Sequence, residues 1–232
     1  MELSSHEWQA IRLSIWVASC SVLVILPFGI PTAWLLARRT FRGKSIVETM
    51  VNLPLVVPPV VTGYLLLVTF GAQGVFGRWL HEWFGIRVVF DWKGAALASA
   101  VMAFPLFVRA CRIAFASVDP RLEAAARTLG AGRLDSFLSI TVPMAWHGIL
   151  AGLVLAFARS IGEFGATIMV AGSIPGRTRT IPLEIFHLLE SPGGMARVRV
   201  LIIASVLIGC LALLVSEMLE RRHRLRVGEP FV

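Results

Sequence analysis

Two ionisable residues lie inside a long apolar part of the sequence, where charged side chains are rare. Arg159 and Glu163 are four positions apart, so on a helix they share one face and can form an ion pair. In a membrane an ionised side chain is costly and therefore faces a partner or water. Two interpretations stay open: a structural salt bridge that neutralises both residues, or an arginine that attracts an anion on its way through the membrane.

Three prolines interrupt a second apolar run, between residues 49 and 77. Each proline removes a backbone donor and crowds the preceding helical turn. In lipid the freed carbonyl groups need partners, and breaks of this kind often line a pathway or act as a hinge in transporters. A kinked structural helix is the alternative. We predict a translocation pathway formed by Pro54, Pro58, Pro59, Arg159 and Glu163.

The sequence lacks the familiar signatures of catalysis. It contains no G-x-x-x-x-G-K-[ST] phosphate loop, no H-E-x-x-H or G-x-S-x-G motif and no paired cysteines. Its three cysteines and five histidines are scattered without metal-ligand spacing. We therefore expect no catalytic residue, no metal and no cofactor, and a separate subunit must bind any ATP. An intramembrane enzyme remains an alternative, for which Arg159 and Glu163 are the candidate groups within the spans.

The elements that position these residues are expected to be membrane helices. Of the 232 residues 56% are hydrophobic and 16% are charged, and the mean hydropathy is +0.77, whereas a soluble domain carries about 25% charged residues. Charge-free runs cover residues 13–37, 49–77 and 136–158, and each exceeds the roughly 20 apolar residues that a spanning helix needs. The first run is also longer than the apolar stretch of a signal peptide, about 7–15 residues, so we expect a retained span.

We predict an all-α fold: a polytopic bundle of about five transmembrane helices, forming a single domain over residues 1–232. The spans are expected at about 11–37, 47–70, 94–117, 145–171 and 197–219. The fourth span carries small residues four positions apart, which allow close helix contact either within the chain or across a dimer axis. These residues are Gly148, Gly152, Ala156 and Ser160.

The basic residues predict how the chain is oriented. Thirteen of them lie on one side, in the segments after the first and third spans and in the carboxyl-terminal tail, and eight lie on the other side. Because cytoplasmic loops are enriched in Lys and Arg, we predict that the amino terminus is outside and the carboxyl terminus is cytoplasmic. The net charge of +8 reflects these loops. No basic face with aromatic residues accompanies it, so we expect no nucleic-acid binding.

One cytoplasmic segment, residues 119–143, reads DPRLEAAARTLGAGRLDSFLSITVP. Asp119-Pro120 is typical of a helix start and Gly130 of a helix end. A second short amphipathic helix is expected at about 133–140, with Pro143 at the start of the next span. A helix this short is marginal alone, but in a groove of another protein it can transmit a rigid-body movement. An ordinary amphipathic connector is the alternative.

This segment resembles the coupling loop in the permease subunits of ABC importers. That family carries Glu-Ala-Ala, three residues and a glycine, then nine residues and Ile-x-x-Pro, and Gly130, Ile140 and Pro143 stand at these offsets. Counted back from Gly130, the acidic position of the family falls on Ala124. Glu123 is one residue early, which turns its carboxylate by about 100° on a helix. The resemblance implies an ATPase contact made by Glu123, Ala124, Ala125, Ala126 and Gly130.

Three further stretches resemble the molybdate permeases of that family. They are residues 53–64 (LPLVVPPVVTGY), 157–167 (FARSIGEFGAT) and 174–182 (IPGRTRTIP). Sulfate permeases share the Gly-Glu-Phe-Gly pattern at 162–165, but they are usually longer and have an extra first span. The resemblance implies a type I importer permease for molybdate in the cell inner membrane, with tungstate, sulfate or thiosulfate as alternative cargo.

The same resemblance implies the partners of the chain. They are a second copy of the permease, two ATP-binding-cassette ATPase subunits that bind the ATP, and a periplasmic oxyanion-binding protein that selects the cargo with high affinity. From the residues alone, an anchoring subunit of another membrane complex also stays open.

Overall fold

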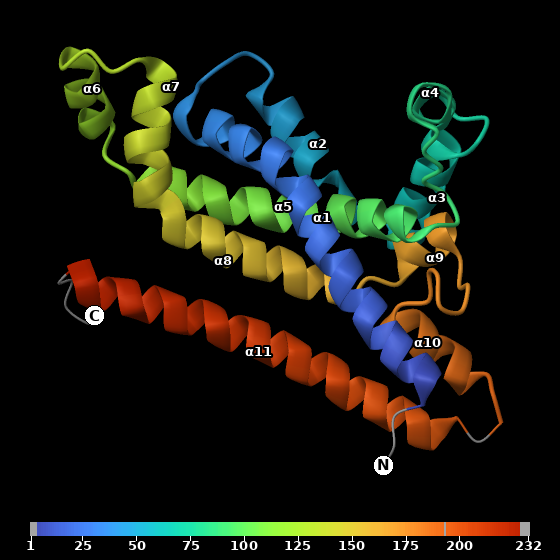
Figure 1. The fold of residues 1–232 in the computed structure, drawn as a ribbon. Coiled ribbons are helices and arrows are strands. Elements are labelled where there is room, and N and C mark those ends of the chain that lie inside the picture. The colour runs from blue at the N-terminus through green and yellow to red at the C-terminus, as the bar shows by residue number, and fades with distance from the viewer. Residues whose placement is uncertain (1–3, 193, 228–232) are drawn as a thin grey trace.

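The computed structural model describes residues 4–192 and 194–227, and every regular element in these ranges is helical. Figure 1 shows long helices that run through the molecule and short helices at its two ends. The predicted all-α fold is confirmed. The elements are α1 (Ser5–Arg38), α2 (Lys44–Val56), α3 (Pro59–Phe70), α4 (Val75–Phe84), α5 (Trp92–Ser117), α6 (Pro120–Thr128), α7 (Arg133–Ser136), the π-helix η1 (Phe137–Thr141), α8 (Val142–Ile161), α9 (Gly165–Ala171), α10 (Ile181–Leu189) and α11 (Met195–Val227).

The core of the bundle is built by α1, α5 and α8. α5 contributes small buried residues, including Ala98, Ala100 and Ala103, so neighbouring helices can approach closely. The rings of Phe107 and Phe115 fill the space between the helices and are fully buried. A Cβ atom at Gly29 of α1 would overlap the ring of Phe107. The crossing of α1 over α5 therefore depends on glycine at this position.

The small residues of α8 pack within the chain. A Cβ atom at Gly148 would collide with the Cβ of Ala114, and one at Gly152 would lie 3.2 Å from the Cβ of Ala110, both on α5. Ala156 is buried in the same core. The Ser21 hydroxyl of α1 donates to the Ser160 hydroxyl over 2.8 Å. Of the two packing arrangements that the sequence left open, the intrachain one is therefore observed.

The second predicted span is broken into two helices. α2 ends at Val56, α3 begins at Pro59, and the two helices differ in direction by 112°. Val57 and Pro58 are extended, with ψ angles of 136° and 134°, because each precedes a proline ring that disfavours the helical conformation. Within the described residues, four helical segments are long and apolar enough to cross a membrane, and the bent pair can supply a fifth.

Two other predicted boundaries are wrong. α8 ends at Ile161 and α9 is a separate helix, so residues 145–171 are not one helix. α11 continues beyond the predicted 197–219 at both ends, and its candidate membrane span, Arg197–Val215, begins at the predicted residue. The short helix expected at 133–140 is instead the start of a continuous helix through α7, η1 and α8. Pro143 does not begin a new helix, because the wide π turn, in which the Val142 N–H donates to the Phe137 carbonyl, accommodates it.

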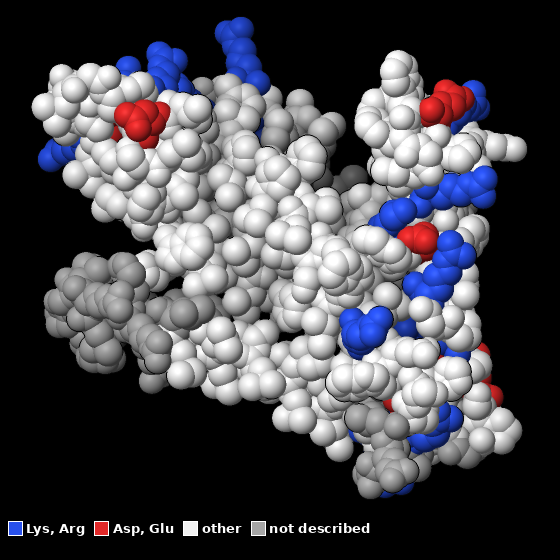
Figure 2. All heavy atoms as spheres, viewed as in Figure 1, with Lys and Arg blue, Asp and Glu red and all other residues white. Residues whose placement is uncertain are grey.

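Charged side chains lie mainly at two ends of the molecule. Figure 1 places α6, α7, the α1–α2 loop and the end of α11 at one end, called here the α6 end. The start of α1, α4 and α10 lie at the opposite end, called the α4 end. On the face shown in Figure 2, the surface between these ends is almost entirely uncharged. Such a band suits the hydrocarbon layer of a membrane. The 119–143 segment and the 72–93 loop thus lie at opposite ends, as predicted.

Candidate functional site

The α6 end presents one short helix whose two boundaries follow from its sequence. The Asp119 carboxylate accepts a hydrogen bond from the Arg121 N–H over 2.9 Å, and Pro120 occupies the first helical position. Gly130 has a φ of +96°, a left-handed conformation that favours glycine and ends the helix. The start and end predicted for this helix are confirmed.

One face of α6 is uncovered. None of its nine residues, all within the described part of the chain, is buried. Ala124 and Ala125 are exposed and Ala126 is half-buried, while Leu129 just after the helix is 89% exposed. A Cβ atom added at Gly130 would meet nothing within 4 Å. Ala124, Ala125 and Gly130 therefore form a small, open surface that another protein can approach closely, and Ala126 is partly covered.

Glu123 faces the bundle instead of this open surface. Its carboxylate accepts a hydrogen bond from the Thr141 hydroxyl at the end of η1. The Arg38 guanidinium lies 3.6 Å from the same carboxylate and also donates to the Val118 carbonyl over 2.7 Å. Glu123 thus ties α6 to α1 and to the start of α8. Sequence reasoning could not find this link, because its partners lie 85 and 18 positions away in the chain.

Arg159 and Glu163 form the predicted ion pair, but not on one helix. Their nearest N–O distance is 2.7 Å, and α8 ends between them at Ile161. The second carboxylate oxygen of Glu163 accepts a hydrogen bond from the Ala166 N–H over 2.9 Å. The side chain of Glu163 is 2% exposed and that of Arg159 is 29% exposed. The carboxylate therefore connects the end of α8 to the start of α9.

The proline break lies against this junction. A Cβ atom at Gly165, the first residue of α9, would lie 2.8 Å from the Cβ of Pro59. One at Gly63 of α3 would lie 2.8 Å from the Ala166 backbone. Of the predicted pathway residues, Pro59 therefore adjoins the segment that holds Glu163, whereas Pro54 lies earlier, within α2.

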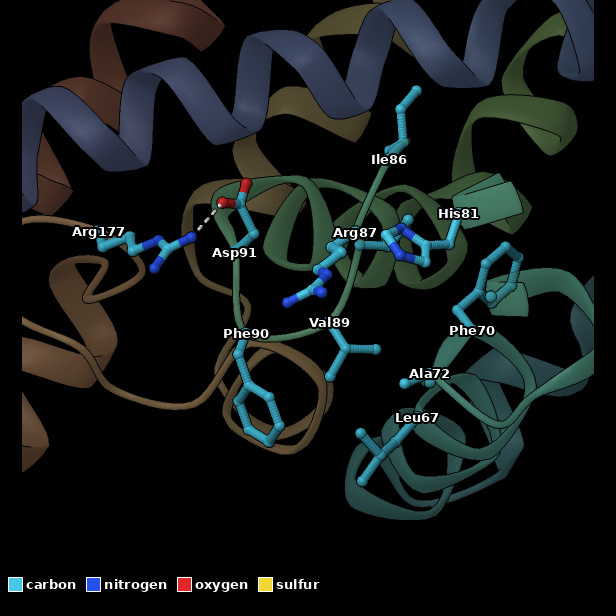
Figure 3. A pocket seen from close by; sticks show the side chains of 13 residues that line it. Leu67, Phe70, Ala72, His81, Ile86, Arg87, Val89, Phe90, Asp91 and Arg177 are labelled. Carbon is cyan, nitrogen blue, oxygen red and sulfur yellow. Dashed lines mark hydrogen bonds and ion pairs between the residues drawn. The ribbon is translucent and has the colours of Figure 1, made fainter. Parts of the chain in front are cut away.

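A cavity of about 530 Å³ opens at the α4 end. Figure 3 shows the Arg87 side chain in this cavity, between His81 and the apolar side chains of Leu67 and Val89. Arg177 lies at one side, where its guanidinium is 3.2 Å from the Asp91 carboxylate. The cavity thus combines apolar walls with one arginine that makes no ion pair with a described residue.

The α4 end is held together by ion pairs that sequence reasoning missed. Arg197 lies 2.6 Å from Glu7, and Arg179 lies 3.3 Å from Glu184. Both carboxylates are almost fully buried. Glu7 and Arg197 are 190 positions apart, so no local spacing could indicate this contact.

The comparisons with known proteins agree with this architecture. Residues 25–225 match the family described as binding-protein-dependent transport system inner membrane component. The chain is 54% identical over 228 residues to the molybdenum transport system permease protein ModB of Escherichia coli K12, covering 98% of this chain and 100% of that protein. It is 48% identical over 223 residues to ModB of Haemophilus influenzae, covering 96% of this chain and 97% of that protein. It is 37% identical over 184 residues to the sulfate transport system permease protein CysT of Escherichia coli K12, covering 78% of this chain and 66% of that protein.

Solved structures share the fold. A chain of a bacterial ABC transporter involved in alginate import matches with a TM-score of 0.67 at 20% identity, covering 94% of this chain and 80% of that one. A chain of the inward-facing methionine transporter MetNI matches with a TM-score of 0.67 at 13% identity, covering 94% of each chain. Because the family match spans most of the sequence and the molybdenum permeases cover it almost end to end, this chain belongs to the family of binding-protein-dependent transport system inner membrane components.

Proposed function

We propose that this chain is the permease subunit of an ATP-driven importer that carries molybdate across the cell inner membrane. The observation that carries the proposal is the 54% identity, over nearly the whole chain, to a molybdenum transport system permease protein. The fold adds support, because its uncharged central band suits a membrane and its α6 end leaves a helix uncovered.

The chain is proposed to leave ATP hydrolysis to a partner ATPase. The open surface of Ala124 and Ala125, with half-buried Ala126 beside it and the Gly130 turn after it, would dock in a groove of that ATPase. Glu123 would act on the side of α6 that faces the bundle. Through its contacts with Thr141 and Arg38, a displacement of α6 would be transmitted to α8 and α1. No catalytic residue and no cofactor of its own is assigned to the permease.

The working unit is proposed to contain two copies of this chain and two ATPase subunits. Exposed apolar residues follow one another along α2 and α3, among them Met50, Leu53, Val56 and Tyr64. Alternating access needs two halves that rock around a central path. The proline break and the Arg159–Glu163 junction would then lie near that path. A periplasmic oxyanion-binding protein would deliver cargo at the α4 end.

The α6 end is proposed to face the cytoplasm, with the amino terminus outside. The count of basic residues, thirteen toward the α6 end and eight toward the α4 end, supports this orientation because cytoplasmic loops are enriched in Lys and Arg.

A pull-down with tagged permease followed by ATPase assays tests the proposal. A soluble ATPase should co-purify at one copy per permease, and its activity should rise when a binding protein loaded with molybdate is added. The 37% identity to a sulfate permease makes sulfate the second candidate cargo. Stimulation by sulfate but not molybdate would assign the cargo differently, and the absence of any ATPase would contradict the transporter function.

A further inference from the structure

A cavity of about 390 Å³ lies at the α6 end, between the end of α1, α6 and the continuous α7–η1 helix. Its walls are of two kinds. Pro31, Trp34 and Phe137 supply an apolar wall, and the rings of Trp34 and Phe137 meet edge to face at 5.6 Å. The other wall carries three arginines: Arg39, Arg127 and Arg133.

No carboxylate among the described residues forms an ion pair with these three arginines, and all three side chains are exposed. Arg39 instead lies over the ring of Trp34, with its guanidinium carbon 5.5 Å from the ring centre. Glu123 also lines the cavity, but its carboxylate is engaged by Arg38 and Thr141. The cavity therefore presents an excess of positive charge.

The apolar wall includes the last turns of α1, a helix long and apolar enough to cross a membrane. Pro31 and Trp34 are in the last two turns of α1, which ends at Arg38. Leu134 and Leu138 on the neighbouring helix are exposed, as expected for side chains at a lipid boundary. An occupant of this cavity must therefore combine an apolar part at membrane depth with a negative group at the surface.

We propose that this cavity binds an anionic phospholipid of the cytoplasmic leaflet. Its phosphate would lie between Arg39, Arg127 and Arg133, because guanidinium groups form strong bidentate hydrogen bonds with phosphate. Its acyl chain would run along Pro31, Trp34 and Phe137. Basic pockets between membrane helices at the cytoplasmic side are suited to such headgroups. The inference rests on the proposed function, since it takes the α6 end to be cytoplasmic.

A bound lipid in this position would act on the coupling helix. It would fill the space between α6 and α1, next to the Glu123–Arg38 contact, and so fix α6 against the bundle. An acidic segment of the ATPase is the competing occupant. The lipid is favoured because the cavity joins an apolar wall, on a helix long enough to cross a membrane, to three arginines, whereas the ATPase would reach the opposite, open face of α6.

Lipid counting tests the site directly. The purified complex is placed in nanodiscs of equal phosphatidylglycerol and phosphatidylcholine, re-extracted, and its retained lipids are counted by mass spectrometry. The test variant carries Arg39→Gln, Arg127→Gln and Arg133→Gln. The control carries Arg42→Gln, Arg109→Gln and Arg121→Gln, which removes equal charge from exposed residues that do not line the cavity. Because each basic residue near an anionic surface raises binding about fivefold, the preference for phosphatidylglycerol should fall at least tenfold in the test variant alone.

Three outcomes would overturn the lipid site. An unchanged lipid preference in the test variant, with loss of the ATPase, would assign the arginines to the ATPase contact. An equal loss of the phosphatidylglycerol preference in both variants would show that the preference depends on general surface charge and not on this cavity. Displacement of phosphatidylglycerol by inorganic phosphate would make the site one for a free anion. The lipid count is made whether or not ATPase co-purifies, so it does not depend on the pull-down.

A second measurement needs no arginine variant. Brominated acyl chains quench nearby tryptophan fluorescence, and Trp34 lines the cavity. The fluorescence that comes from Trp34 is the difference between the fluorescence of the unmodified complex and that of the Trp34→Phe variant. Brominated phosphatidylglycerol should quench this fluorescence more strongly than brominated phosphatidylcholine at equal mole fraction, and equal quenching would contradict the proposal.

Discussion

At the scale of single residues, two carboxylates each join several parts of the molecule. Glu163 uses one oxygen for Arg159 and the other for the start of α9. Glu123 uses a single oxygen, which accepts a hydrogen bond from Thr141 at the end of η1 and lies 3.6 Å from Arg38 of α1. Glu163 was predicted as a pathway residue from its place in an apolar run, and Glu123 as an ATPase contact from the family resemblance; each makes a contact that holds neighbouring elements together.

The Arg159–Glu163 pair allows a sharp test of structural against pathway roles. Arg159→Gln should lower the membrane level of the permease, because it leaves a buried carboxylate unpaired, which costs up to about 3–5 kcal/mol. Glu163→Gln should cost less, since Arg159 is partly exposed and can reach water. The double variant should regain both level and uptake, because the amide oxygen introduced by Glu163→Gln can still accept the hydrogen bond from the Ala166 N–H. Uptake at matched membrane levels measures this, and a stable but inactive double variant would make Arg159 a pathway residue.

Gly130 tests the coupling helix at the same scale. Gly130→Val forces a β-branched residue into a left-handed conformation, which costs about 1–2 kcal/mol, and should therefore shift the end of α6. Uptake should fall while the chain stays in the membrane. Gly132→Val is the matched control, because its backbone is extended and a Cβ there meets nothing within 4 Å. Equal uptake in the two variants would argue against a coupling role.

At the scale of elements, close helix packing depends on small residues at defined places. α8 approaches α5 because Gly148 and Gly152 carry no side chain where Ala114 and Ala110 lie. The sequence could predict this stripe from its spacing of four, and it could predict α6 from Asp119, Pro120 and Gly130. It could not predict which helix the stripe meets, nor the break after Ile161, because both depend on contacts between distant parts of the chain.

Gly148→Val should destabilise the α8–α5 contact. Its Cβ would collide with that of Ala114, and overpacking of this kind typically costs about 1–3 kcal/mol. The amount of folded permease in detergent and its melting temperature should both fall. Gly209→Val in α11, where a Cβ meets nothing within 4 Å, should leave both unchanged. Equal losses would show that the contact tolerates a larger side chain.

At the scale of the whole molecule, an almost uncharged band separates two charged ends on the face shown in Figure 2, and apolar side chains of α2, α3 and α11 are exposed. The sequence predicted the all-α fold class and the placement of the 119–143 segment and the 72–93 loop at opposite ends. Both predictions follow from the long apolar runs. It could not predict the long-range ion pairs of the α4 end, such as Arg197 with Glu7, because spacing carries no information about partners so far apart.

The proposed assembly predicts a definite mass. The complex purified through the permease should contain two copies of this 25.4 kDa chain with two ATPase subunits, because one bundle alone encloses little of a transport path. Native mass spectrometry or light scattering measures the composition. A complex with a single permease copy would contradict the proposed dimer.

Transport by the reconstituted complex tests the central claim most directly. The permease and its co-purified ATPase are placed in liposomes with ATP inside, and binding protein loaded with radioactive molybdate is added outside. We predict molybdate accumulation that requires ATP and is lost in Gly130→Val but not in Gly132→Val. No ATP-dependent accumulation of molybdate, with an intact complex of the predicted composition, would contradict the account.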